Sequence, residues 1–251
     1  MKKLLISIVL CGFFSMAFVA EAWAQSVYYS NSISSLKGKA LRDTLHELAQ
    51  TNHRSLTYKE ARQYLFGDIH LEDATVGYKV KDVYCRKNFT RKVGPMRIPS
   101  HEELNCEHTW PQSKFSGSYT KTLQKGDLHH LYPTDSRANS TRGNHEFANV
   151  DEGRQLNNCE SSWFGTSGRS SSTYFEPPNE HKGNVARAIF YFAVRYNMEV
   201  STIQENALRE WHQLDPVDQV ELQRNEKVFQ IQGNRNPFID RPELVSQISN
   251  F

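Results

Sequence analysis

The residues best suited to chemistry lie in one stretch of the chain, between positions 106 and 144. Glu107 and His108 place a carboxylate beside an imidazole, and Asn139 and Arg142 follow in the same stretch. Hydrolysis of a phosphodiester needs a base that deprotonates water, a cation that neutralises the developing charge and, usually, a cationic side chain. Oxygen donors such as the Glu107 carboxylate and a carboxamide suit Mg²⁺, which keeps several of its waters. His108 can then act as the general base, with its second nitrogen held by a backbone carbonyl.

Two strands and a helix would have to position these side chains. Successive side chains of a strand point to opposite faces, so Glu107 and His108 can share a site only where the strand twists or ends. Pro111 indicates that the strand does end there. A second strand over residues 127–132, closed by the proline that follows, and a helix opened by the polar segment around Asn139 would complete a compact ββα unit.

Taken singly, these signals also fit simpler explanations. An isolated Glu-His pair is often a pair of surface residues without a catalytic role. His129-His130 could equally be one core histidine and one exposed histidine. The order of the elements, rather than any one residue, favours a catalytic centre.

The composition indicates one folded domain that is mainly helical. The chain has 251 residues, of which 38% are hydrophobic, and this is enough to bury a sizeable core. The formal charge is only +2, so any basic surface for a polyanion must be local. Apolar residues at three- and four-residue spacing predict helices over residues 36–49, 58–66, 183–196, 208–212 and 216–232. We expect an α+β domain, mainly helical with a small antiparallel sheet, in which the helix at 183–196 is buried and central.

Other segments are rich in β-forming or turn-forming residues. Residues 80–85 should form a strand, and residues 87–100 a basic loop that is either merely solvated or follows a phosphate backbone. Residues 149–182 and 234–238 have the composition of loops.

Glycine and proline mark the expected helix ends. Gly67 should end the second helix and Gly233 the last one, which should carry Pro216 in its first turn. His53, between the first two helices, should be a surface residue.

The first 24 residues have the pattern of a secretory signal peptide. Lys2 and Lys3 precede an apolar run, and Ala22-x-Ala24 favours cleavage after Ala24. The alternative is an uncleaved anchor, but the apolar run is shorter than the roughly 20 residues that a membrane span needs. We therefore expect residues 1–24 to direct export to the periplasm or the medium, and residues 25–251 to form a monomeric mature domain without a membrane segment.

Cleavage of the leader would leave three cysteines in an oxidising compartment, so one disulfide and one free thiol are expected. The spacing alone does not determine the pairing. We favour Cys85 with Cys106, because this bridge would tether the Glu107-His108 strand to the preceding segment. The isolated cysteines lack the Cys-x-x-Cys spacing of structural zinc sites.

The motifs resemble those of the bacterial endonuclease I family of secreted and periplasmic nonspecific nucleases, whose ββα-metal core is shared with His-Asn-His nucleases. The core motifs are Glu107-His108-x-x-Pro111, Asp127-Leu128-His129-x-Leu131-x-Pro133 and Asn139-x-x-Arg142-Gly143-Asn144. The likeness extends over nearly the whole mature chain, at Tyr28-Tyr29, Cys159-Glu160, Glu176-Pro177-Pro178, the 183–196 helix and Gln232-Gly233-Asn234-x-Asn236-Pro237-Phe238. The ββα core would span approximately residues 104–148.

The resemblance implies a role for each of these side chains. Glu107 and Asn139 would bind a divalent ion, Mg²⁺ with Mn²⁺ or Ca²⁺ as alternatives, and His108 would activate water. Asp127 and His129 would orient the site rather than react.

The loop after the Glu-His strand departs from the family. Some members have a longer, cysteine-bearing loop there, which supplies an arginine that stabilises the scissile phosphate. The cations of this chain's short loop are all lysines, which bind phosphate less strongly than arginine does. Arg142 is our first candidate for the missing role and Arg137 the second. Lys114, Arg137 and Asn144 are the expected contacts with substrate.

These features predict an exported, Mg²⁺-dependent, sequence-nonspecific endonuclease that cuts DNA and RNA and leaves 5′-phosphate ends, as the family does. Contacts through phosphate and metal carry no base information. Two rivals stay open, namely a noncatalytic nucleic-acid-binding protein on the same fold and a metal-dependent phosphoesterase that acts on small molecules. A plasmid nicking assay with Mg²⁺ and then EDTA distinguishes the nuclease from the noncatalytic binding protein. Competition by long DNA distinguishes it from the small-molecule phosphoesterase.

Overall fold

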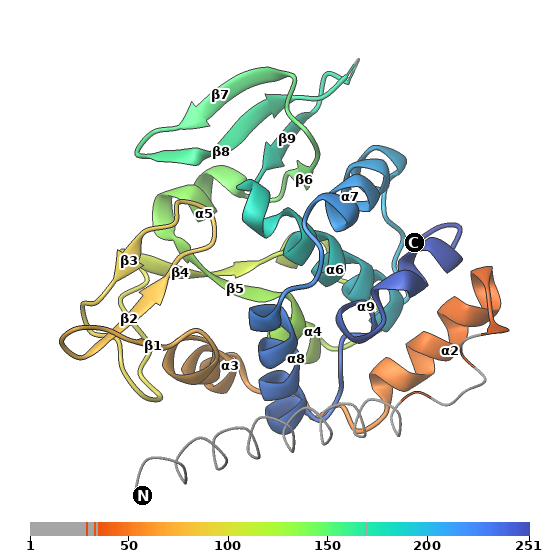
Figure 1. The fold of residues 1–251 in the computed structure, drawn as a ribbon, viewed down its shortest axis with the longest axis horizontal. Coiled ribbons are helices and arrows are strands. Elements are labelled where there is room, and N and C mark those ends of the chain that lie inside the picture. Colours follow the sequence, from red (N-terminus) through yellow and green to blue (C-terminus); the bar gives the residue numbers. More distant parts are fainter. Residues whose placement is uncertain (1–28, 30–32, 34, 169) are drawn as a thin grey trace, which may run out of the picture.

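The computed structural model describes Tyr29, Ile33 and residues 35–168 and 170–251 (Figure 1). The predicted signal peptide and Tyr28 lie outside these residues. The helices are α2 (Gly38–Gln50), α3 (Tyr58–Tyr64), α4 (Lys121–Lys125), α5 (Ser136–Arg142), α6 (Asn179–Arg195), α7 (Thr202–Leu214), α8 (Gln219–Gln232) and α9 (Pro237–Asp240). The strands are β1 (Glu72–Asp73), β2 (Tyr78–Lys81), β3 (Asn88–Phe89), β4 (Leu104–His108), β5 (Leu131–Asp135), β6 (Glu146–Phe147), β7 (Glu152–Leu156), β8 (Cys159–Thr166) and β9 (Thr173–Glu176).

Helix α6 is the centre of the molecule, as predicted for residues 183–196. Its surface is apolar nearly all round, and the run from Val185 to Arg195 is buried. Helices α2, α7 and α9 pack against it, and β4 and β5 cross beside it in Figure 1. None of the helices in the described part of the chain combines the length and apolar character of a membrane span.

The predicted ββα unit is present, with one change in its second strand. β4 and β5 pair antiparallel from Leu104 opposite Asp135 to His108 opposite Leu131, and α5 follows β5 at once. The strand predicted at 127–132 is wrong in its bounds, because Leu128–His130 is a 3₁₀ turn and β5 continues through Pro133. A two-stranded sheet leaves one edge of each strand unpaired, so it tolerates a residue without an N–H.

The part of the chain that the structure describes contains three small sheets, in the strand orders β1-β2-β3, β4-β5 and β6-β9-β8-β7. All strand pairs are antiparallel except β6 with β9, so the expected α+β class is confirmed. The loop predicted at 149–182 is wrong, because β7, β8 and β9 lie within it. Gly153 and Gly165 face each other there, and a Cβ on Gly165 would lie 2.1 Å from the Glu152 carbonyl oxygen. The glycines thus permit close strand pairing in a segment whose composition resembles a loop.

Several predicted boundaries also differ. The second helix passes through Gly67 as a π-turn, Leu65–Ile69, and the backbone of Met96 packs where a Gly67 side chain would lie. Pro216 precedes α8, whose N-cap is Asp218, whereas Gly233 does end α8, with φ of 86°.

Three further predictions outside the catalytic unit need correction. The strand predicted at 80–85 is β2, Tyr78–Lys81, because the Asp82 carboxylate accepts three following backbone N–H groups and turns the chain. The short helix α9 lies where a loop was expected. His53 is half-buried, and its Nδ1 accepts a hydrogen bond from Arg195.

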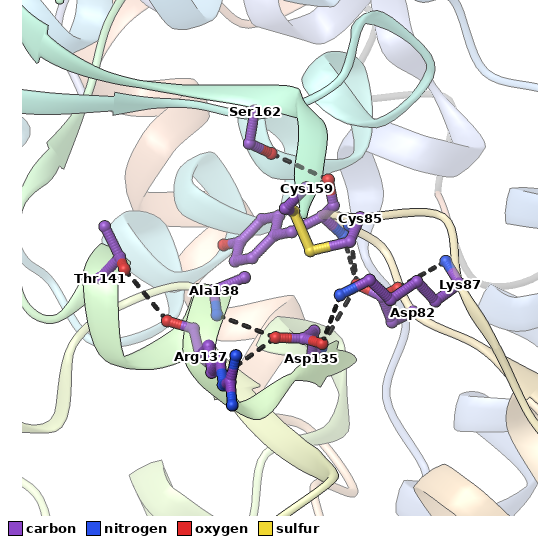
Figure 2. The surroundings of a disulfide bond; sticks show 10 residues. Asp82, Cys85, Lys87, Asp135, Arg137, Ala138, Thr141, Cys159 and Ser162 are labelled. Atoms are coloured by element: carbon purple, nitrogen blue, oxygen red, sulfur yellow. Dashed lines mark hydrogen bonds and ion pairs between the residues drawn. A yellow bond between two sulfur atoms is a disulfide. The ribbon is translucent and has the colours of Figure 1, made fainter. Parts of the chain in front are cut away.

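The disulfide joins Cys85 to Cys159, so the predicted Cys85–Cys106 bridge is wrong (Figure 2). Cys106 is a buried free thiol in β4 and packs in a hydrophobic cluster with Leu104 and Leu128. The error follows from the missed sheet, because β8 carries Cys159 back to the segment that follows Asp82.

Replacing both Cys85 and Cys159 with serine should lower the free energy of unfolding by about 4 kcal/mol. The bridge closes a loop with a sequence separation of 74 residues, and opening it restores conformational entropy to the unfolded chain. Urea denaturation without reductant measures the change, and reduced wild type should match the double variant. Equal stability of the variant and the oxidised wild type would contradict this expectation.

Candidate active site

A cavity of about 410 Å³ opens where β4 ends beside α5. Its wall is mostly polar and is made by Tyr58, Asn105, Cys106, Glu107, His108, Pro111, Gln112, Ser113, Asn139, Arg142, Gly143 and Asn144. All four residues predicted to carry the chemistry, Glu107, His108, Asn139 and Arg142, therefore line one cavity. Strand β4 ends at His108, so the side chains of Glu107 and His108 can both reach the cavity although they are neighbours in the sequence.

The two ring nitrogens of His108 have different partners, a backbone carbonyl at Nε2 and the Gln112 side chain at Nδ1. His108 Nε2 lies 3.2 Å from the Lys125 carbonyl oxygen, and its Nδ1 lies 3.3 Å from the Gln112 side-chain nitrogen. A carbonyl only accepts, so Nε2 carries the proton and Nδ1 has the lone pair. Burial, together with the neighbouring His130 imidazole, lowers the pKa of His108 well below its usual value. The ring is thus neutral at neutral pH and suited to accept a proton.

Glu107 is almost fully buried, with 1% of its surface exposed. Its Oε1 accepts a hydrogen bond of 2.8 Å from the Tyr84 hydroxyl and lies 3.1 Å from Arg142 Nη1. Burial raises the pKa of Glu107, although Arg142 and the Tyr84 hydroxyl act in the opposite direction. Among the described residues Oε2 has no hydrogen-bond partner, so it is the oxygen that a cation could take.

The two α5 residues have different surroundings. Asn139 is half-buried at the cavity, and its carboxamide makes no hydrogen bond to any described residue. Arg142 is 1% exposed, and its guanidinium donates to the carbonyls of His108 and Thr109 as well as pairing with Glu107. Arg142 thus holds the end of β4 in place, and this geometry does not support the expected contact with a scissile phosphate.

The predicted substrate contacts are distributed over different surfaces. Asn144 lies at the rim of the cavity, with its Nδ2 3.5 Å from Ser113 Oγ. Lys114 does not line the cavity and forms a 3.1 Å ion pair with Glu146. Arg137 is exposed on α5 and lines a separate cavity.

Asp127 and His129 lie in the core behind the site and do not line the cavity. Asp127 accepts hydrogen bonds from the Tyr191 and Tyr196 hydroxyls, at 2.9 and 2.8 Å, and from the Gln232 amide at 2.8 Å. Burial alone would raise the pKa of Asp127, but the surrounding imidazoles and the amide lower it overall.

His129 is likewise a core residue. Its Nε2 lies 3.0 Å from the Asn234 carbonyl oxygen, and burial lowers its pKa to about 3. Asp127 caps the turn that enters β5 and His129 lies within it, so their contacts join the ββα unit to α6, to α8 and to the segment that follows α8.

Three supporting residues were not predicted, namely Tyr84, Gln112 and Tyr58. The Tyr58 ring lies 5.4 Å from the His108 ring, with the cationic groups of Arg62 and Lys125 at 4.5 and 4.4 Å from its centroid. The contact between Gln112 and His108 could have been suggested by the sequence, because the two residues are only four positions apart. Tyr84 and Tyr58 reach the site from distant segments, so no local pattern could have indicated them.

The donor set is compatible with a hard cation that keeps most of its waters. The described residues contain no group of three or more His, Cys, Asp or Glu side chains placed to hold a metal. Glu107 and Asn139 nevertheless line one cavity, and neither Glu107 Oε2 nor the Asn139 side-chain oxygen has a hydrogen-bond partner among the described residues. One carboxylate and few further protein ligands are typical of Mg²⁺ sites, whereas most zinc sites contain several histidine or cysteine ligands.

Comparison with known proteins identifies relatives that are named nucleases. The extracellular ribonuclease of Bacillus subtilis (strain 168) is 31% identical over 253 residues, which cover 93% of this chain and 82% of that relative. The extracellular ribonuclease of Bacillus amyloliquefaciens matches to the same extent. The periplasmic deoxyribonuclease of Aeromonas hydrophila is 28% identical over 148 residues, 57% of this chain and 61% of that relative.

The sequence profile of the family described as Endonuclease I matches residues 37–243, which include every strand and every α-helix described above. The match confirms the resemblance recognised from the Glu107-His108 and Asn139-x-x-Arg142 motifs. The chain belongs to the Endonuclease I family and is a nucleic-acid hydrolase.

Proposed function

We propose that the protein is an exported, Mg²⁺-dependent and sequence-nonspecific endonuclease that leaves 5′-phosphate ends on DNA and RNA. One observation carries the proposal. Glu107 Oε2, the Asn139 carboxamide and the lone pair of His108 Nδ1 belong to residues of the same cavity, and the other nitrogen of His108 is held by a backbone carbonyl.

In the proposed reaction each side chain has one task. His108 Nδ1 takes a proton from the attacking water, while the Lys125 carbonyl fixes the ring and stabilises the imidazolium that forms. Glu107 and Asn139 would hold the divalent ion, which supplies charge neutralisation at the phosphate and the leaving oxygen. Arg142 acts as a positioning residue, because its guanidinium orients Glu107 and the His108 carbonyl from a buried place.

The proposed substrate range has two supports. The cavity wall offers amides and hydroxyls to a phosphate, and such contacts do not discriminate between bases. Among the relatives, the Bacillus proteins are named ribonucleases and the Aeromonas protein a deoxyribonuclease. Export is supported by the leader at residues 1–24 and by relatives named extracellular or periplasmic.

Cleavage of matched duplex DNA, single-stranded DNA and RNA with Mg²⁺, Mn²⁺, Ca²⁺ or EDTA tests the proposal. We expect cleavage of DNA and RNA with Mg²⁺, none with EDTA, and products that a kinase labels only after phosphatase treatment. Retarded mobility without cleavage in every condition would instead favour the noncatalytic binding protein. Cleavage of small phosphodiesters that long DNA does not inhibit would favour the small-molecule phosphoesterase.

Tyr84→Phe should weaken binding of the divalent ion by about 10- to 100-fold, the usual effect of losing an outer hydrogen bond to a metal ligand. The hydroxyl donates to Glu107 Oε1, and its loss leaves a buried carboxylate with one fewer donor. Titration with Mn²⁺ followed by electron paramagnetic resonance measures the affinity directly. Tyr78→Phe, which removes the hydroxyl of an exposed tyrosine in β2, is the control. Equal Mn²⁺ affinity in both variants would exclude this role for Tyr84.

A further inference from the structure

A second cavity, of about 230 Å³, lies on the other flank of α5 from the active site, between this helix and the β7–β8 hairpin. Figure 1 shows the hairpin next to α5 at one end of the molecule. The cavity is lined by Arg137, Ala138, Thr141, Arg154, Gln155, Leu156, Asn157, Cys159 and Phe164. Arg137 from α5 and Arg154 from β7 thus line the same cavity.

These arginines are free to bind an external anion. Arg137 and Arg154 are both exposed, and neither guanidinium forms an ion pair or hydrogen bond with any described residue. The nearest candidate partner on α5's N-terminal side, Asp135, is already paired with Lys87 at 2.9 Å. Most other arginines of the described chain are engaged by carboxylates or carbonyls, whereas these two guanidiniums have no such partner among the described residues.

The hairpin adds an aromatic surface beside the charges. Arg154 stands directly opposite Phe164 in the β7–β8 register, so the two side chains project from the same face of the sheet. Phe164 is half-buried and packs edge-on against His145, with 5.0 Å between ring centroids. Arginines beside an aromatic ring are a combination with which proteins bind phosphate backbones and stack bases.

We propose that this groove is a second phosphate-binding subsite for the nucleic-acid strand, with Arg137 and Arg154 as its ligands. The inference rests on the proposed function, since the strand is the one cut in the first cavity. Asn139 borders one cavity and Arg137 the other, so the strand would cross α5. A helix with its side chains is about 10–12 Å wide and a B-form strand rises about 3.4 Å per nucleotide, so the subsite lies about three nucleotides from the cut.

Salt dependence of binding tests the proposal without requiring catalysis. Affinity of the full mature chain for a long duplex is measured in EDTA over a range of salt concentrations, for wild type, Arg137→Gln, Arg154→Gln and the double variant. Each lost phosphate contact should reduce the slope of log K against log salt by about 0.9, and the double variant by about 1.8. The control is Lys37→Gln, which removes an exposed charge at the N-cap of α2, a helix that lies away from the β7–β8 hairpin in Figure 1.

Cleavage of substrates of two lengths gives an independent measurement. With Mg²⁺, kcat/KM for the long duplex should fall in the double variant relative to kcat/KM for a dinucleotide, which is too short to span both cavities. Slopes equal to that of Lys37→Gln, or an equal loss for both lengths, would overturn the proposal. A wild-type protein that binds but cuts neither substrate refutes the nuclease proposal alone, because the salt slopes still decide whether the groove binds phosphate.

Discussion

His108→Ala should reduce kcat by about 10²- to 10⁴-fold while leaving the affinity for DNA in EDTA unchanged. The variant removes the proposed general base, a group that contributes about this factor to proton transfer. Single-turnover cleavage with saturating Mg²⁺ isolates the chemical step from product release. Removal of the ring leaves room in the cavity for a free imidazole molecule, so added imidazole should restore part of the activity.

The control is His101→Ala, which removes an exposed histidine from the segment before β4. It should behave as wild type in both assays. Full metal-dependent cleavage by His108→Ala would eliminate His108 as the base. Equal losses of DNA binding and cleavage would point instead to collapse of the cavity.

The pH dependence of the wild type provides a further check on His108. Burial and the neighbouring His130 lower the pKa of His108, and a bound cation would act in the same direction. The base is active when neutral, so activity should be lost only as the pH falls through this lowered pKa. We expect the acid limb of kcat/KM clearly below the ordinary histidine value of about 6.5. An acid limb at or above this value would contradict the assignment.

Glu107→Gln should weaken Mn²⁺ binding by more than about 100-fold, since loss of outer partners of a metal ligand alone costs about 10- to 100-fold. Metal-dependent cleavage should fall in parallel at low Mn²⁺ concentration. Glutamine is chosen because it retains the shape of the side chain beside Tyr84 and Arg142. Alanine would leave the Arg142 charge buried without its carboxylate, at a cost of about 3–5 kcal/mol, and would confuse folding with binding.

Glu103→Gln is the matched control for this variant. Glu103 precedes β4 and is exposed, where it pairs with Arg91. Electron paramagnetic resonance titration of both variants and thermal unfolding without metal separate ligand loss from instability. Unchanged Mn²⁺ affinity in a folded Glu107→Gln protein would refute the ligand role.

The elements of the site could be predicted because their signals are local. The Glu-His pair, the proline that follows it and the polar opening of α5 lie close together in sequence, and they define the ββα unit. The roles of Arg142 and Asp127 were harder to predict. The sequence of a motif is the same whether its charged residue contacts substrate or pairs with a buried partner. Arg142 is enclosed by the carbonyls of His108 and Thr109, a fact of tertiary packing.

The fold was predictable where helices are long and amphipathic, and less so where strands pair closely. In the β7–β8 hairpin Gly153 and Gly165 lie opposite each other, which allows the strands to pair closely. Glycine is more common in loops than in strands, so the composition of this segment predicted a loop. The disulfide was mispaired for the same reason, because Cys159 lies in that unpredicted hairpin.

The hydrogen bonds around Asp127 have a consequence for protein engineering. The unit at residues 104–148 carries every residue assigned to chemistry, which would make it attractive as a minimal nuclease module for grafting. Yet the partners of Asp127 are Tyr191, Tyr196 and Gln232, contributed by or adjoining helices α6 and α8. An excised unit would expose this buried carboxylate and retain only a two-stranded sheet, which is marginally stable in water. The catalytic motif is thus not transplantable by itself, and a transferable nuclease must bring its two supporting helices with it.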